Sequence, residues 1–223
     1  MLFREVYLGS SVGRALMHVE VRETLEMRGV VLDIGGGRRR TYLGHARSEP
    51  RRVVTIDIEP GPDVNVVASA TCMPLDRASV DTVLCFNVLE HIYDHRAALA
   101  EIARVLKRDG ALHGWVPFII GVHAAPNDYF RYTPSSLEQL LLESGLEPTR
   151  IACCGNVFLS AFDLVRPHLR GGFIGRLLRV YGLALALLAQ LVYTGATRIV
   201  GESALDPAAS PSGIWFSARP NTE

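Results

Sequence analysis

The sequence has little cysteine, no excess charge of either sign and no apolar run at its beginning. Its four cysteines, Cys72, Cys85, Cys153 and Cys154, lack the paired spacing of a metal framework, so we expect buried, reduced thiols and no metal site. A redox or metal role for the vicinal pair is the alternative. The 23 basic and 23 acidic residues cancel, which leaves no overall field to attract nucleic acid. Without a leading signal segment, a cytoplasmic location is expected.

A short apolar run leads into an acid and three glycines. Val30–Leu32 has the character of a buried strand, and Asp33 and then Gly35, Gly36 and Gly37 follow it. Glycine has no Cβ and adopts positive φ readily, so such a turn lets backbone amides approach a ligand closely. The stretch predicts a nucleotide-type ligand site, or else only a tight turn from a strand to a helix.

A second run of this kind follows about twenty residues later. Arg51–Ile58 is rich in β-branched residues and carries Asp57 next to its last residue, Ile58. A doubly wound fold places at this distance the carboxylate that holds a ribose diol. We therefore expect Asp57 to bind the ribose of a cofactor, with an exposed strand end as its alternative role.

These features are compatible with two kinds of cofactor. A nicotinamide-binding domain carries Gly-x-Gly-x-x-Gly, but Arg40 occupies the third glycine position here. The spacing Asp33-x-Gly35-x-Gly37 resembles instead the pattern of S-adenosylmethionine-dependent methyltransferases of the Rossmann-like class I. The chain is similar to the type 11-like methyltransferases among them.

The resemblance runs from Val30 to Thr149 and follows the order of the family's motifs. It includes the third strand with its turn, the fourth strand with its Leu-Glu-His exit, and the helix that leads into the fifth strand: Val66–Leu75, Ser79–Ile92 and Leu99–Leu112. Trp115–Phe118 and His123–Pro134 resemble a subgroup of bacterial small-molecule or glycan-associated methyltransferases. The resemblance thus implies methyl transfer to a small-molecule or a glycan- or lipid-linked precursor.

The resemblance also implies S-adenosyl-L-methionine as the cofactor and a set of residues that bind it. These residues stand at the ends of the first, second and fourth strands and after the third: Asp33, Gly35, Gly36, Gly37, Asp57, Ile58, Ser69, Ala70 and Asn87. Because a sulfonium methyl is already electrophilic, the protein mainly has to hold an acceptor in line with it.

A general base would help a hydroxyl acceptor, and two histidines are candidates. His123, after the fifth strand, is the first, and His91, in the Leu-Glu-His exit, is the second. Their alternative role is to brace the loops that carry them. Four polar residues beyond His123 either contact substrate or form a buried polar lock: Asp128, Tyr129, Arg131 and Tyr132.

Two positions depart from the family pattern. Arg39 stands where a third glycine is common, and Ser69 replaces the aspartate that meets the adenine amino group. These departures leave open a catalytically inactive cofactor-binding or scaffold protein. The run Arg38–Arg40 at a helix start would face the positive end of the helix dipole, which suggests a nearby anion, either the cofactor's carboxylate or a substrate phosphate.

The alternation of strands and helices predicts an α/β fold with a doubly wound, mostly parallel sheet. The resemblance implies seven strands in the order 3-2-1-4-5-7-6, with the last strand, Gly213–Ala218, antiparallel. Helices are expected over residues 12–27, 40–46, 95–107 and 134–144. With 223 residues, 48% of them hydrophobic, we expect one domain over 1–223, with a helical insert over 156–210 before the final strand.

The insert contains a long uncharged segment. Val180–Thr197 has no charged residue, and a basic amphipathic stretch, Phe173–Arg179, precedes it. Its length is at the short margin for crossing a membrane. Residues 173–197 predict a packed core or dimer helix, with a peripheral membrane helix and a true membrane span as alternatives.

Overall fold

The computed structural model describes residues 2–37, 41–46, 48, 50–169, 172–200 and 210–221, with side chains up to residue 194 in the long helix. The chain forms two compact units. The sheet unit contains Glu20–Pro117, Val122–Ala152 and Ile214–Glu223, and the helical unit contains Met1–Val19, Phe118–Gly121 and Cys153–Gly213. Arg38–Arg40 lie outside the described residues. They include Arg39, which departs from the glycine pattern, and they are the residues near which an anion is predicted.

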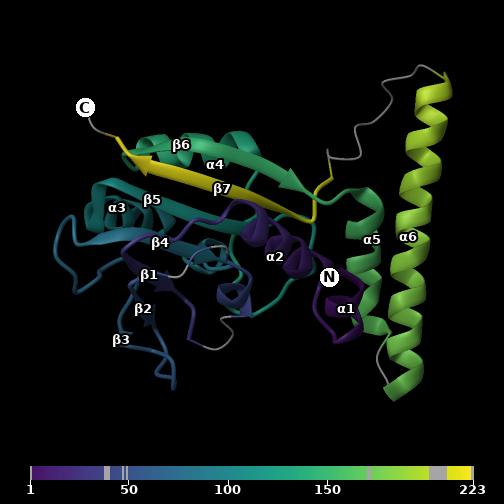
Figure 1. Ribbon diagram of the computed structural model, residues 1–223, viewed down its shortest axis with the longest axis horizontal. Coiled ribbons are helices and arrows are strands. Elements are labelled where there is room, and N and C mark those ends of the chain that lie inside the picture. The colour runs from purple at the N-terminus through teal and green to yellow at the C-terminus, as the bar shows by residue number, and fades with distance from the viewer. Residues whose placement is uncertain are drawn as a thin grey trace. The chain divides into compact units, whose positions relative to one another are not determined.

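Seven strands form one sheet in the order β3-β2-β1-β4-β5-β7-β6 (Figure 1). The strands are β1 Val30–Ile34, β2 Arg52–Asp57, β3 Val66–Val67, β4 Val80–Phe86, β5 Leu106–Pro117, β6 Leu146–Cys154 and β7 Gly213–Pro220. The pairs β1–β2, β1–β4, β2–β3 and β4–β5 are parallel, and the last strands run antiparallel. The α/β fold, the strand order and the antiparallel last strand are confirmed.

The central strands are buried because they are apolar on both faces, as in a sheet covered on two sides. All residues of β1 after Val30 are buried, and only Asp81 in β4 escapes full burial. Trp115, Trp215 and Phe216 are the bulkiest fully buried side chains of the sheet unit. Gly114 of β5 allows the close packing of β7, since a Cβ there would collide with the Phe216 ring.

The helices of the sheet unit begin as expected and differ at some ends. They are the 3₁₀ turns η1 Thr41–His45 and η2 Leu89–His91, and the helices α3 His95–Val105 and α4 Pro134–Glu143. α3 stops at Val105 rather than Lys107, because Leu106 is already extended and starts β5. The expected helix 40–46 is a 3₁₀ turn over its described part.

The helical unit consists of α1 Leu2–Tyr7, the first eight residues of α2 Val12–Thr24, α5 Val157–Val165, η3 Arg166–His168 and α6 Gly172–Val200. Its core is apolar and joins α1, α2, α5 and α6 through Val6, Val12, Leu159, Phe162, Leu183 and Ala186. The carboxylate of Asp163 accepts hydrogen bonds from the first two amides of α2, Val12 at 3.0 Å and Gly13 at 3.2 Å. A carboxylate here satisfies amides that a helix start leaves without partners.

In α6, only one stripe of side chains packs into a core, as predicted for residues 173–197. Leu183 and Ala186 are buried in this unit, and Leu187 packs beside them. Most of the other large apolar side chains are exposed, namely Phe173, Ile174, Leu177, Leu178, Tyr181, Leu185, Leu188, Leu191 and Val192. Gly172–Thr194 is long and apolar enough to cross a membrane by length and composition alone.

The expectation of four buried thiols is wrong for two of them. Cys85 and Cys154 are buried, but Cys72 and Cys153 are exposed, and all four are free. Cys72 lies in the turn after β3, and Cys153 alternates along β6 with the buried Cys154, so its side chain points to the opposite face.

Candidate functional site

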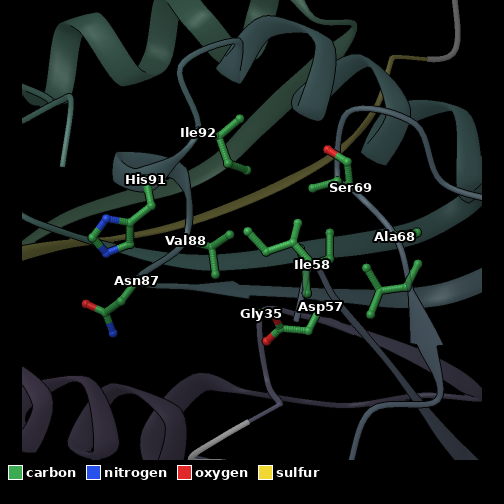
Figure 2. Close-up of a pocket in the computed structure, with 12 residues that line it drawn as sticks. Gly35, Asp57, Ile58, Ala68, Ser69, Asn87, Val88, His91 and Ile92 are labelled. Carbon is green, nitrogen blue, oxygen red and sulfur yellow. The ribbon is translucent and has the colours of Figure 1, made fainter. Parts of the chain in front are cut away.

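A cleft of about 630 Å³ opens at the carboxyl ends of β1, β2 and β4, within the sheet unit. Its walls are formed by Ile34, Gly35, Ile56, Asp57, Ile58, Ala68, Ser69, Ala70, Asn87, Val88, His91 and Ile92. Asp57 and Gly35 lie together, whereas Asn87 and His91 project from the strand exit on another side of the cleft (Figure 2).

The glycine turn after β1 is shaped so that side chains cannot replace it. Gly35 has a φ of +72°, and a Cβ there would lie 2.5 Å from Cγ2 of Val88. A Cβ at Gly36 would collide with the carboxylate of Asp33, which is fully buried. Tyr42 holds that carboxylate by donating its hydroxyl to Oδ1 at 2.5 Å. The backbone is therefore open to the cleft at Gly35 and rigidly supported from behind.

Asp57 ends β2 at the rim of the cleft, and its carboxylate is fixed by backbone amides. Gly37 donates its amide to Oδ2 at 3.2 Å, and Glu59 donates its amide to Oδ1 at 3.0 Å. Each oxygen keeps further acceptor capacity, because a carboxylate can accept about four hydrogen bonds. A diol could therefore donate to Asp57 without displacing these amides.

The opposite walls of the cleft come from the turn after β3 and from the exit of β4. Ser69 is exposed at the cleft, with its hydroxyl 2.8 Å from the Thr71 hydroxyl, and Ala70 is buried behind it. Asn87 has a φ of +55°, a conformation that costs a non-glycine residue free energy, and its amide donates to the Trp115 carbonyl at 2.9 Å. The strained backbone fixes Asn87 at the wall of the cleft.

Next to this exit, Glu90 is a fully buried carboxylate between two histidines. Its Oε1 lies 3.6 Å from Nε2 of His91 and 4.0 Å from Nε2 of His123. The two imidazole rings meet edge to face with centroids 4.9 Å apart. Burial raises the pKa of Glu90 to about 8. His91 lines the cleft, and His123, which contacts His91, is not among the residues of the cleft wall.

The segment after His123 forms a charged pair around that histidine. Arg131 donates two hydrogen bonds to Asp128, at 2.7 and 2.8 Å, and this guanidinium holds the pKa of Asp128 well below its usual range. Oδ2 of Asp128 also accepts the backbone amide of His123 at 2.9 Å. The side chain of Asp128 is almost completely buried.

The two tyrosines of this segment differ in exposure. Tyr132 is buried, donates its hydroxyl to the Leu89 carbonyl at 3.1 Å, and has its pKa raised by burial. Tyr129 is exposed, and its hydroxyl bonds the side chain of Asn127 at 2.9 Å. The contacts of Asp128, Arg131 and Tyr132 are those of a polar lock, while Tyr129 remains accessible.

The structure brings together most of the residues expected at the cofactor site. Six of the nine line the cleft, namely Gly35, Asp57, Ile58, Ser69, Ala70 and Asn87, and the candidate base His91 lines it with them. Asp33, Gly36 and Gly37 stand behind the turn and support it. Tyr42 and Glu90 support or border the cleft but have no role that was predicted from the sequence. Glu90 could have been noticed as the acid placed between the apolar Leu89 and a histidine.

The strand order, the glycine turn and the acid at the end of β2 are those of the class I methyltransferase fold. Residues 32–113 match the sequence model of a family described as a methyltransferase domain. Through this region the chain is similar to class I, S-adenosylmethionine-dependent methyltransferases.

Two curated proteins of Mycobacterium tuberculosis, from strains CDC 1551 and H37Rv, are each named a probable S-adenosylmethionine-dependent methyltransferase. Each is 31% identical to this chain over 121 residues, which cover 52% of the chain and 40% of the relative. The chain therefore spans less than half the length of the curated relatives it matches.

Solved structures share the fold at low sequence identity. The cyclase SpnF is 17% identical with a TM-score of 0.59, covering 95% of this chain and 82% of that chain. The 1,6-didemethyltoxoflavin-N1-methyltransferase of Burkholderia thailandensis, solved with S-adenosylhomocysteine, is 18% identical with a TM-score of 0.56, covering 98% and 82%. At these identities the likeness concerns the fold alone.

Proposed function

We propose that the protein transfers the methyl group of S-adenosylmethionine to a small-molecule or glycan-type acceptor, including lipid-linked precursors. The observation that carries the proposal is the cleft in which Gly35, Asp57, Ser69 and Asn87 converge beside a polar exit from β4. S-adenosylmethionine fits this cleft, because the turn at Gly35 has room only for backbone and the carboxylate of Asp57 can accept further hydrogen bonds. A macromolecular nucleic acid substrate stays outside the proposal, since the chain has no net charge.

In this proposal each residue contributes binding and orientation. When bound, S-adenosylmethionine supplies an electrophilic methyl group. Asp57 accepts the ribose hydroxyls, Ser69 and Ala70 meet the adenine side, and Asn87 holds the methionine end. Gly36, Gly37 and Asp33 keep the turn in shape. Ile58, Val88 and Ile92 provide apolar walls that exclude water from the transfer.

The proton of a hydroxyl acceptor would leave to a nearby base. His91 has the better position, because it lines the cleft and its Nδ1 lies 2.5 Å from the Asn127 carbonyl, which leaves Nε2 as the acceptor atom. His123 acts through His91 in this scheme. Asp128, Arg131 and Tyr132 position the loop that carries His123 in this scheme and do not contact substrate. Tyr129 is the exposed residue of the four and is available to contact substrate.

The second candidate is a protein that binds S-adenosylmethionine without methyl transfer. It is favoured by the uncharged Ser69 and by the cyclase among the structures with this fold, since a shared fold does not fix the reaction. Both candidates predict cofactor binding, and only the first predicts turnover.

Calorimetric titration with S-adenosylmethionine and S-adenosylhomocysteine tests the site, with Asp57→Ala as the variant and Asp76→Ala, an exposed acid outside the cleft, as the control. We expect micromolar binding by wild type and the control, and at least a tenfold loss in Asp57→Ala. Release of S-adenosylhomocysteine with a panel of hydroxyl, amine and glycan acceptors then separates the enzyme from the scaffold. Absence of cofactor binding in wild type would contradict both.

We propose further that α6 contacts a membrane surface from a cytoplasmic location. The exposed apolar side chains of the helix are accompanied by Arg176 and Arg179 in its first turns, and basic residues beside an apolar face favour anionic headgroups. This proposal agrees with a lipid-linked acceptor and keeps 1–223 as one functional domain.

A further inference from the structure

We propose that Glu90, His91 and His123 form a binding site for a divalent transition-metal ion, Zn²⁺ being the best match, at the border of the cofactor cleft. The three side chains lie in the sheet unit, on the exit of β4 and on the loop after β5. One carboxylate and two imidazoles are a donor set that binds Zn²⁺ and similar ions with coordination positions left open.

The spacing of the donor atoms suits one ion. The ligand atoms of the three residues all lie within 4.8 Å of one another, with Oε1 of Glu90 at 3.6 and 4.0 Å from the two Nε2 atoms. Bonds of about 2.1 Å in a tetrahedral site separate ligand atoms by about 3.4 Å. Side-chain shifts of under about 1 Å would therefore complete the site.

Both imidazoles are oriented with Nε2 toward the carboxylate and Nδ1 away from it. Nδ1 of His91 donates to the Asn127 carbonyl at 2.5 Å, and Nδ1 of His123 lies 3.5 Å from Oδ2 of Asp128. Metal-binding histidines commonly donate their second ring nitrogen to a carbonyl or carboxylate in this way, which presents the other nitrogen as a lone pair. Nη2 of Arg131 is also 3.5 Å from Nδ1 of His123, but it is bonded to Asp128.

Glu90 itself points to a ligand. Its side chain is fully buried, and neither carboxylate oxygen has a hydrogen-bond partner among the described residues. An unpartnered buried carboxylate is costly in a folded protein, and buried charges are normally paired or coordinated to a metal. The guanidinium of Arg131, which acts on Glu90 through its charge, is committed to Asp128 and to the Phe130 carbonyl. A cation between Glu90 and the histidines would satisfy all three.

Three protein ligands leave a place for an oxygen from solvent or substrate. Because His91 also lines the cleft, an ion here would be accessible to an acceptor bound there. A hydroxyl bound to the ion would release its proton to solvent more easily, so the acceptor would be an oxygen nucleophile such as an alcohol or phenol, whose oxygen takes the methyl group as the bond from that methyl to the sulfonium sulfur breaks. This last step rests on the proposed function; ion binding does not. With an ion in place, Nε2 of His91 is a ligand and no longer a base.

Metal binding can be measured without any substrate. The purified protein is stripped with a chelator and titrated with Zn²⁺ by calorimetry and with Co²⁺ by absorption spectroscopy. We expect one ion per chain with micromolar or tighter affinity, and a Co²⁺ spectrum of low-coordinate nitrogen and oxygen ligands without thiolate charge-transfer bands. Thiolate bands would place the ion at the exposed Cys72 or Cys153 and overturn the proposal, as would the absence of binding.

Variants locate the ion. Glu90→Gln and His123→Ala should each weaken Zn²⁺ binding by tenfold or more, Asp128→Asn by a smaller factor, and His168→Ala, an exposed histidine of η3, should leave it unchanged. If Glu90→Gln fails to fold, the variant His123→Ala, at a partly exposed position, and the Co²⁺ spectrum of wild type still test whether the ion binds at this site. Unaltered binding in His123→Ala would overturn the assignment.

Cofactor affinity is measured in the same samples. Ion binding without S-adenosylmethionine binding would contradict the proposed function and leave the metal site standing, whereas the reverse result would refute only the metal site.

Discussion

At the scale of single residues, a tight steric constraint acts at Gly36. A Cβ there meets the Asp33 carboxylate, which cannot move away because it is buried and held by Tyr42. We expect Gly36→Ala to lower the free energy of unfolding by about 1–3 kcal/mol and to weaken S-adenosylmethionine binding by at least tenfold. Urea denaturation and calorimetry measure the two effects.

Gly44 is the matched control for this substitution. It has no atom within 4 Å of an added Cβ and an ordinary φ, so Gly44→Ala should stay within about 0.5 kcal/mol of wild type. Equal behaviour of the two variants would show that the glycine turn tolerates side chains.

His113 makes stability depend on pH. Burial, with Arg219 as a second cause, lowers its pKa to about 4, and its Nδ1 lies 3.0 Å from the Ser217 hydroxyl. The unfolded chain binds this proton near pH 6.5 and the folded chain only near pH 4. The contribution of His113 to stability is therefore complete above about pH 6.5 and declines as the pH falls toward 4, by at most about 3 kcal/mol. Glu90, whose pKa is raised to about 8, contributes the opposite dependence, because its neutral form is favoured in the folded chain between about pH 4.5 and 8.

Urea titrations between pH 4.5 and 7.5 measure this dependence. Relative to wild type, His113→Gln should lose the part of the slope in which stability rises with pH below about 6.5, and the exposed His168→Gln should retain the wild-type slope. A profile in His113→Gln that equals that of wild type would assign this part of the dependence to other groups.

The residues at the glycine turn and at the end of β2 could be predicted to meet at one cleft, because their pattern is local to the chain. An acid two residues before a glycine turn, and a second acid at the next strand end, can be read directly from Asp33, Gly35 and Asp57. Which of His91 and His123 is the better candidate base could not be predicted. Only the folded loop after β5 shows that His91 lines the cleft and that His123 contacts His91 without lining it. Glu90 was missed because burial of an acid is a property of packing.

At the scale of elements, the start of α4 is a capping box. Thr133 accepts the Ser136 amide at 3.2 Å, and Ser136 accepts the Thr133 amide at 2.9 Å. Thr133→Ala should cost about 1 kcal/mol of unfolding free energy, measured by thermal or urea denaturation. The neighbouring Ser135→Ala is the control and should change little, and equal losses in both would argue against the cap.

Element types were predictable from periodicity, and element ends only where a cap marks them. Thr133 and Gly145, with a φ of +77°, bound α4 as the sequence indicates. No such residue marks the end of α3, where the strand β5 competes for Leu106 and ends the helix at Val105. The start of β6 at Leu146 likewise depends on pairing with another strand.

At the scale of the whole molecule, the exposed face of α6 predicts association with lipid. Wild type should sediment with vesicles that contain anionic lipid, and the triple variant Leu177→Gln, Leu188→Gln, Leu191→Gln should lose at least half of this binding. Vesicles of neutral lipid are the control and should bind less, because Arg176 and Arg179 would lack partners. A stable dimer in light scattering, with no vesicle binding, would assign the face to a second copy.

The strand order has a consequence for how the chain is made. The outer strand β6 pairs only with β7 in this sheet, and about sixty residues, including α5 and α6, separate the two in sequence. At ribosomal rates of about 5–20 residues per second, β6 waits for its partner for roughly 3–12 seconds. During that interval the nascent chain carries an open strand edge and an apolar helix at once, so we expect synthesis in cells to be the stage at which this protein is most exposed to aggregation and most dependent on chaperones.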